Sequence, residues 1–234
     1  EGQWLRLQVG SLENLGLMEA ANGGVLDVGG RWGGGGRVNP GTGRVELGGT
    51  FSPAAAQWGR SPRAESVRVK GVLDLGGGRL VLDAATGPWT LANGRLVNGT
   101  VEVGEGGGLV LREQATLEKV ALKGFVSAGE YETVRVSGGL DLREGRLRIP
   151  GGRLEIVETQ TIEGGVVELL GSGAWSYLNV PGNVTLTLSP TTVLRGGPGW
   201  VTGDGSVRNL GAIRADIEGQ WLRLQVGSLE NLGL

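Results

Sequence analysis

The 234-residue chain contains neither cysteine nor histidine. The absence of cysteine excludes disulfides, thiolate metal sites and cysteine nucleophiles. The absence of histidine excludes a Ser-His-Asp triad and removes the commonest metal ligand. Several of the usual ways to build a catalytic or metal-binding site are therefore not open to this sequence.

Neither positive nor negative charge dominates, because 22 Lys and Arg residues are mixed with 24 Asp and Glu residues along the chain. Without a basic stripe, we expect no nucleic-acid partner. No apolar run approaches the roughly 20 residues that span a bilayer, so we expect no membrane span. The opening EGQWLRLQVG lacks both the charged and the apolar region of a signal peptide, which we expect to lie far upstream of an interior segment.

A composition that favours helices is also lacking, because 48 of the 234 residues are glycine. Each interior glycine weakens a helix by roughly 1 kcal/mol relative to alanine. A strict Gly-X-Y period is missing, which excludes collagen. Hydrophobic residues nevertheless make up 39% of the chain and its net charge is only -2, so it can bury a core.

What recurs is a short unit in which a glycine is followed by apolar residues at the second and fourth positions after it. The residue between the two apolar positions is usually polar, as Asp27, Glu46 and Glu155 are. This period of two predicts short strands with one face inward and one toward water. Asn22-Gly23 and Asn98-Gly99 predict turns between strands. The units begin at Gly24, Gly43, Gly71, Gly78, Gly99, Gly107, Gly138, Gly145, Gly152, Gly165 and Gly182.

Many short strands fit either an antiparallel sandwich or barrel, or a parallel β-solenoid. We predict the solenoid, because each coil contacts only its neighbours and such a structure can continue indefinitely. Glycine suits the tight corners that recur in every coil. The spacing of the units predicts coils of about 20–25 residues with two or three strands each, and roughly ten coils.

Residues 1–17 and residues 218–234 have the same sequence, EGQWLRLQVGSLENLGL. Three explanations remain open: a window cut from a longer array in which position 218 begins the next repeat, an engineered overlap, or a duplicated terminus with its own purpose. We favour the array, because both ends lie within continuous strand patterns. Residues 1–234 would then form one continuous solenoid segment, with 1–217 as one full repeat and 218–234 as the start of the next.

A second similarity indicates the coil length. Residues 11–20 and 206–215 share the pattern Ser-x-x-Asn-Leu-Gly-x-apolar-x-Ala. In an array, the next copy of the first segment begins at position 228, which lies 22 residues after position 206. We therefore predict a coil of about 22 residues, with these segments stacked directly on each other at the junction between repeats.

These patterns resemble a known family. The segments Asn209–Ile213 and Gly43–Gly49 are similar to the β-solenoids of filamentous haemagglutinin and of autotransporter passengers. Glu19–Gly24 and Leu82–Trp89 are similar to the glycine-rich repeats of giant bacterial surface proteins. The resemblance covers essentially the whole chain. It implies a right-handed parallel β-helix, secretion, and a role at a surface, in a matrix or in adhesion.

Parallel β-helices also include enzymes that cleave polysaccharides, whose sites need clustered carboxylates. Here the acidic residues are spread one per strand, which predicts a solvated face with arginine partners such as Arg79 and Arg146. Neither a repeated calcium-binding nonapeptide nor a phosphate loop is present. We therefore predict no catalytic residue, metal or cofactor.

Tryptophan is the residue type best suited to contact a partner. An exposed tryptophan can stack on a sugar ring or on a neighbouring filament, whereas a buried one fills the coil interior or a corner. We select Trp58, Trp89 and Trp175 as candidates for lateral or glycan contacts, with interior packing as the alternative. Residues 57–63 are predicted to form a projecting loop, because strand units are sparse there.

Together these features predict a structural or adhesive segment of an extracellular bacterial fibre that continues end to end through neighbouring repeats, without catalysis. Its expected partners are other repeats, laterally adjacent filaments and surface glycans. The alternative is a carbohydrate-binding or polysaccharide-cleaving β-helix, with a groove lined by Trp58, Trp89 or Trp175 beside two carboxylates. Irregular stretches such as residues 51–66 argue against a third explanation, a designed solenoid.

Overall fold

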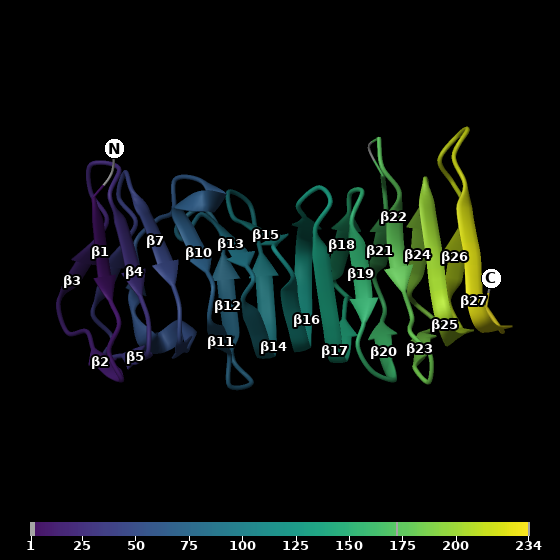
Figure 1. The fold of residues 1–234 in the computed structure, drawn as a ribbon, viewed down its shortest axis with the longest axis horizontal. Coiled ribbons are helices and arrows are strands. Elements are labelled where there is room, and N and C mark those ends of the chain that lie inside the picture. The colour runs from purple at the N-terminus through teal and green to yellow at the C-terminus, as the bar shows by residue number, and fades with distance from the viewer. Residues whose placement is uncertain (1–2, 172, 234) are drawn as a thin grey trace. The chain divides into compact units, whose positions relative to one another are not determined.

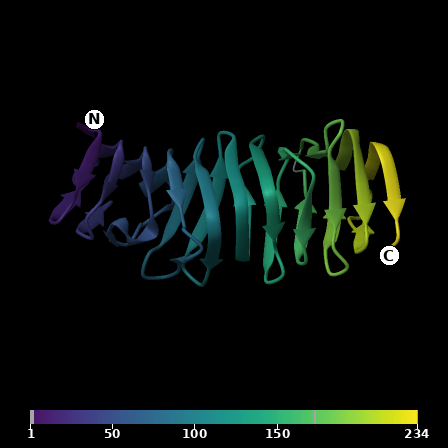
Figure 2. The same cartoon turned by 90° about the horizontal axis from the view of Figure 1, so that it is seen from below.

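The computed structural model describes residues 3–171 and 173–233 and is all-β, with about 11 turns of a parallel β-solenoid. The chain divides into two compact units, residues 1–110 (unit 1) and residues 111–234 (unit 2). Within each unit the strands of successive coils lie side by side (Figures 1 and 2). The predicted solenoid of roughly ten coils is thus confirmed as a fold.

Unit 1 has three strands per coil, which follow one another around three faces. Its first face contains β1 (Trp4–Leu7), β4 (Val25–Val28), β7 (Arg44–Leu47), β10 (Val67–Val69) and β13 (Pro88–Ala92). Its second contains β2 (Ser11–Glu13), β5 (Arg31–Gly33), β8 (Thr50–Phe51), β11 (Val72–Asp74) and the start of β14 (Arg95–Val103). β3 (Leu17–Glu19), β6 (Arg37–Asn39) and β9 (Gln57–Trp58) form a third, separate sheet, and β12 (Arg79–Leu82) pairs with the end of β14.

Unit 2 follows the same plan with longer strands, several of which bend around a corner. β15 (Gly108–Arg112) spans the boundary between the units, and β16 (Ala115–Ala128) and β17 (Thr133–Asp141) each serve more than one face. The next strands are β18 (Gly145–Ile149), β19 (Arg153–Ile156), β20 (Gln160–Glu163), β21 (Val166–Leu169), β22 (Ser176–Asn179) and β23 (Thr185–Leu188). The last are β24 (Val193–Gly196), β25 (Gly199–Asn209), β26 (Ala212–Arg214) and β27 (Leu222–Asn231).

The core consists of apolar residues that stack on like residues of the next coil. In unit 2 one such row runs through Val126, Leu147, Val167 and Leu194, which lie opposite one another in successive strands. Each of these four side chains is 0% exposed. The alternation read from the sequence therefore places its apolar positions inward, as predicted, because only a period of two keeps every second residue on one face.

Strand pairing gives the coil lengths directly. The coil that leads from Leu26 to its partner Val45 is shorter than the predicted range, and the coil that leads from Val167 to its partner Leu194 is longer. The predicted range of about 20–25 residues is therefore slightly too narrow. The longer coil includes residues 170–171 and 173–175 between β21 and β22, and loops can lengthen at the corners without disturbing the stacked strands.

Corners, not hairpins, join the strands, because successive coils pair in parallel. Asn22 and Gly23 adopt positive φ of 51° and 73°, as their sequence predicts. Gly49, with φ of 64°, lies so close to the preceding coil that a Cβ there would overlap the carbonyl oxygen of Gly30. Glycine is required at Gly49 for its close approach as well as for its φ.

Asp83 organises a longer corner within the segment Leu82–Trp89. Its Oδ1 accepts hydrogen bonds from the backbone N–H groups of Ala85 and Thr86, at 2.8 and 3.2 Å. These donors hold the pKa of the Asp83 carboxyl below its ordinary value, because they stabilise the ionised form. The motif that resembles bacterial surface repeats is thus a self-capped turn.

The helical segments among the described residues are short. They are the two 3₁₀ helices η1 (Pro53–Ala55) and η2 (Ala64–Ser66), of three residues each. Within residues 3–171 and 173–233, no helix has the length and apolarity needed to cross a membrane.

Alanine substitutions at Gly23 and Gly49 separate two effects on stability, namely backbone strain and the close approach of neighbouring coils. Alanine at Gly23 or at Gly49 meets a similar positive φ, but a Cβ at Gly23 has no atom within 4 Å. We expect Gly23→Ala to cost about 1 kcal/mol of unfolding free energy, and Gly49→Ala to cost clearly more. Urea denaturation followed by circular dichroism measures both. Equal losses would contradict the close packing at Gly49.

Candidate functional site

The most informative contact involves the second copy of the duplicated sequence. β27, which belongs to this copy, lies in parallel along β25. Leu222 lies opposite Gly199, and Asn231 lies opposite Asn209, 22 residues away. The register shifts between Gly203 and Ser206, where the strand turns a corner. This pairing confirms the predicted stacking of Ser206–Asn209 on the duplicated segment and the predicted coil length at that point.

Every polar pair that follows this corner is complementary. The hydroxyl of Ser228 donates to that of Ser206 at 2.8 Å, and Arg208 Nε lies 3.0 Å from Glu230 Oε2. Asn209 Nδ2 donates to Asn231 Oδ1 at 2.7 Å. Two hydroxyls, two amides and one ion pair thus match across the two coils, and these cross-strand pairs fix the register.

Asn209 and Asn14 perform the same local task. Asn209 is fully buried, and its Oδ1 accepts the N–H of Gly211 at 3.1 Å. Asn14 is 7% exposed, and its Oδ1 accepts the N–H of Gly16 at 3.2 Å. Each asparagine then donates from Nδ2 to a later coil, to Asn231 or to the carbonyl of Arg37. The Asn-Leu-Gly motif is therefore a corner that also bonds to its neighbour.

The two copies have the same sequence but differ in local structure. In the first copy, β1 and β2 are separated by Gln8–Gly10, which lie outside the strands. In the second copy, the corresponding residues 225–227 are part of the single strand β27. The adjoining coil decides the difference: β1 and β2 pair with β4 and β5, whereas β27 follows the bent strand β25.

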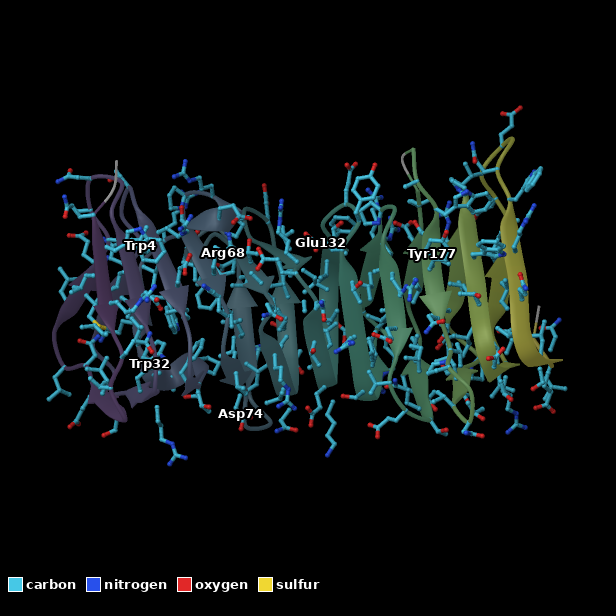
Figure 3. All side chains as sticks on the ribbon, in the orientation of Figure 1. Trp4, Trp32, Arg68, Asp74, Glu132 and Tyr177 are labelled. Carbon is cyan, nitrogen blue, oxygen red and sulfur yellow. The ribbon has the colours of Figure 1, made fainter. Side chains whose placement is uncertain are left out.

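Both copies leave large apolar side chains in contact with solvent. Trp4 (Figure 3) and Leu5 are 53% and 57% exposed, and Trp221 and Leu229 are 60% and 45% exposed. Leu5 and Leu229 are inward positions, and their partners Leu26 and Val207, which have a coil on each side, are only 2% and 1% exposed. The exposed surface of these two leucines is thus that of a coil with a neighbour on one side.

In unit 1 the predicted contact residues Trp58 and Trp89 belong to an aromatic cluster of the interior. Trp58 lies edge-on to Trp89 and to Trp32, with ring centroids 4.8 and 5.9 Å apart, and Trp32 stacks on Phe51 at 4.6 Å. Trp89 is 1% exposed, which corrects its selection as a surface contact. Trp58 is partly buried, and its Nε1 donates to the carbonyl of Pro53 at 2.8 Å.

The predicted projecting loop at residues 57–63 is also corrected. Gln57 and Trp58 form β9, which pairs with β6, and Ser61 is 0% exposed. The segment packs into the coil because it supplies the bulky ring that fills its wide interior. Gln57, Arg60, Pro62 and Arg63 are exposed, and the Nε of Arg60 donates to the carbonyl of Ala84.

Trp175, the third candidate, lies in a second aromatic group, in unit 2. Its ring centroid is 5.6 Å from that of Trp200, which is 5.9 Å from that of Tyr177. The guanidinium of Arg223 lies over the rings of Trp175, Trp200 and Trp221 at 5.8, 5.5 and 4.9 Å. These distances are typical of cation–π contacts. The group is partly accessible, so a contact through Trp175 remains a prediction.

Sequence reasoning missed this aromatic group, although a signal was present. Tyr177, Trp200 and Arg223 follow one another at equal intervals of one coil, and strand pairing places them directly opposite in successive coils. Once a coil length is known, the aromatic residues Tyr177 and Trp200, one coil apart, identify an outward row.

Glu168 in β21 lies between the core residues Val167 and Leu169, so its side chain occupies an outward position. It is nevertheless buried. It is 2% exposed and lies 3.1, 3.6 and 3.8 Å from nitrogens of Arg148, Arg146 and Arg195. Arg146 confirms a predicted arginine partner, but the predicted solvated face is wrong at Glu168, because the arginines cover its carboxylate. An open hollow of about 680 Å³ beside them is lined by Phe125, Arg146 and Arg148, among others.

Comparison of the chain with models of protein families, with curated proteins and with solved structures finds no match. The β-solenoid is established by the strand pairing alone. The relationship to filamentous haemagglutinin or to autotransporter passengers therefore remains a prediction from the sequence motifs.

The different positions of Trp89 and Trp175 predict different costs of their removal. Trp89→Ala empties part of a closed core and should lower the free energy of unfolding by about 3–5 kcal/mol. Trp175→Ala, at a partly accessible site, should cost about 1 kcal/mol or less. Urea denaturation followed by circular dichroism gives both values. A small loss of unfolding free energy for Trp89→Ala would contradict the burial of this ring in the core.

Proposed function

We propose that this chain is a structural or adhesive segment of an extracellular, tandemly repeated bacterial fibre that acts through the stacking of its coils and not through catalysis. One observation carries the proposal. An identical copy of residues 5–14 pairs in parallel with residues 199–209 of the same chain. A repeat that begins with this sequence therefore has a specific place on the repeat before it.

The same register supports continuation beyond the described strands. The offset of 22 residues between Asn209 and Asn231 carries the segment Leu17–Glu19 of a following copy onto β26, Ala212–Arg214. Met18 would then stack on Ile213, and Glu19 would lie opposite Arg214. All three faces of the coil would pair, with apolar residues on apolar residues and opposite charges together.

The alternative junction, in which the two copies stack on each other, is disfavoured by charge. It would place Arg6 opposite Arg223 and Glu13 opposite Glu230, since the sequences are identical. Like charges directly opposite destabilise a sheet. The duplicated segment is thus suited to pair with residues 199–214 along one edge and with the second coil of a repeat along its other edge.

A chain with two repeats tests the proposal. Residues 1–217 followed by residues 1–234 should fold as a solenoid with about ten additional coils, or roughly 48 Å of added length at about 4.8 Å per coil. Electron microscopy and small-angle scattering compare it with the single-repeat chain. A matched chain carrying Asn209→Leu at the junction should lose the continuous stack there. Two solenoids that move independently in the unsubstituted chain would contradict the proposal.

Carbohydrate binding is a second candidate function, favoured by the aromatic group around Trp175. Aromatic faces stack on sugar rings, and Trp175, Tyr177 and Trp200 lie within one partly accessible group. We expect Trp175→Ala to weaken retention in affinity electrophoresis through polysaccharide gels at least several-fold. Phe125→Ala removes an exposed ring from a different face and serves as control. Equal retention of both variants and the unsubstituted chain would contradict this function, and release of reducing ends would indicate cleavage.

A further inference from the structure

We propose that separate copies of this chain join by strand exchange, in which residues 4–14 of one copy replace residues 221–231 of another on β25. This inference rests on the proposed function and extends it to contacts between chains. The occupant is a second copy, because its first coil carries the sequence that already occupies this position.

The exchange replaces each contact with an identical one. Ser11, Glu13 and Asn14 would take the positions of Ser228, Glu230 and Asn231, opposite Ser206, Arg208 and Asn209. The hydroxyl pair, the ion pair and the amide pair would all be restored. β25 therefore regains from the incoming strand each of these three contacts that it loses with the displaced strand.

The incoming coil also keeps its own neighbours. β1 and β2 pair with β4 and β5 through one edge only. The other edge of β1 and β2 is free among the described residues, and Trp4 and Leu5 beside it are more than half exposed. Pairing with β25 would cover this edge without breaking any contact inside the second copy.

The geometry at the corner is compatible with exchange. In the first copy the chain leaves the strand at Gln8–Gly10. In the pairing of β25 with β27 the register shifts between Gly203 and Ser206, opposite Val226–Ser228, which correspond to Val9–Ser11. The corner of the incoming coil therefore coincides with the corner of the coil beneath it.

Such a contact is heterologous, because the exchanged segment and its site lie in different parts of the sequence. Each added copy again presents its own β25, held by a replaceable strand. Heterologous contacts that do not close into a ring produce open filaments. Residues 218–231 then act as a placeholder that protects β25 until another copy arrives.

Cross-linking of the 234-residue chain tests the exchange, because these residues contain no cysteine. In the Ser11→Cys/Ser206→Cys variant, strand exchange brings the two thiols of different copies directly opposite each other. We expect a ladder of disulfide-linked multimers under oxidising conditions, which disappears on reduction. The Gln8→Cys/Ser206→Cys control is three residues out of register and should give few multimers. Equal ladders, or monomers only, would overturn the proposal.

Two matched charge substitutions determine which strand is exchanged. Glu230→Lys places a lysine of the resident strand opposite Arg208, whereas Glu13→Lys places it on the incoming strand. In the cysteine-pair background, Glu230→Lys should increase the multimer fraction about two- to fivefold and Glu13→Lys should decrease it by a similar factor. Identical effects of the two substitutions would contradict exchange at this site.

The two-repeat chain distinguishes failure of this inference from failure of the proposed function. If the covalently linked repeats stack continuously but the cysteine variants remain monomeric, exchange is wrong and the fibre proposal stands. If the linked repeats fail to stack, the proposed function itself fails.

Discussion

The structure depends on one constraint, which is that every coil must pair in parallel with the next and stack like residues upon it. Val126, Leu147, Val167 and Leu194 satisfy it in the core, each fully buried on its neighbour. The corners satisfy it through asparagine and glycine, which turn the chain tightly enough for the coils to approach. Loops absorb the variation in coil length, so that short and long coils both keep their strands in register.

The same constraint applies to the duplicated sequence. A segment that must pair on both sides needs complementary residues above and below, and Ser228, Glu230 and Asn231 have them in Ser206, Arg208 and Asn209. A coil with one neighbour exposes apolar residues, as both copies do. Continuation within a chain and exchange between chains are two ways to cover the same surface, and both use the register that β25 and β27 already display.

Outward positions are free of the core's restrictions and carry the features that differ from coil to coil. Arginine pairs with acids on neighbouring strands, and around Glu168 three arginines bury a single carboxylate. Elsewhere Tyr177, Trp200 and Arg223 align because successive coils bring positions one coil length apart together. A solenoid thus turns sequence spacing into rows on its surface.

The sequence by itself determined the fold class, the inward rows and the coil length at the junction, because period-two alternation and repeated motifs are local features that any solenoid must preserve. It did not determine which tryptophans are buried. Trp89 and Trp58 lie in unit 1's interior, whereas Trp175 belongs to a partly accessible group in unit 2. Nor could it show that the duplicated segment forms two strands in one copy and one strand in the other. Only the tertiary structure decided these points, because the neighbouring coil supplies both the space that a ring fills and the hydrogen-bond partners that a strand follows.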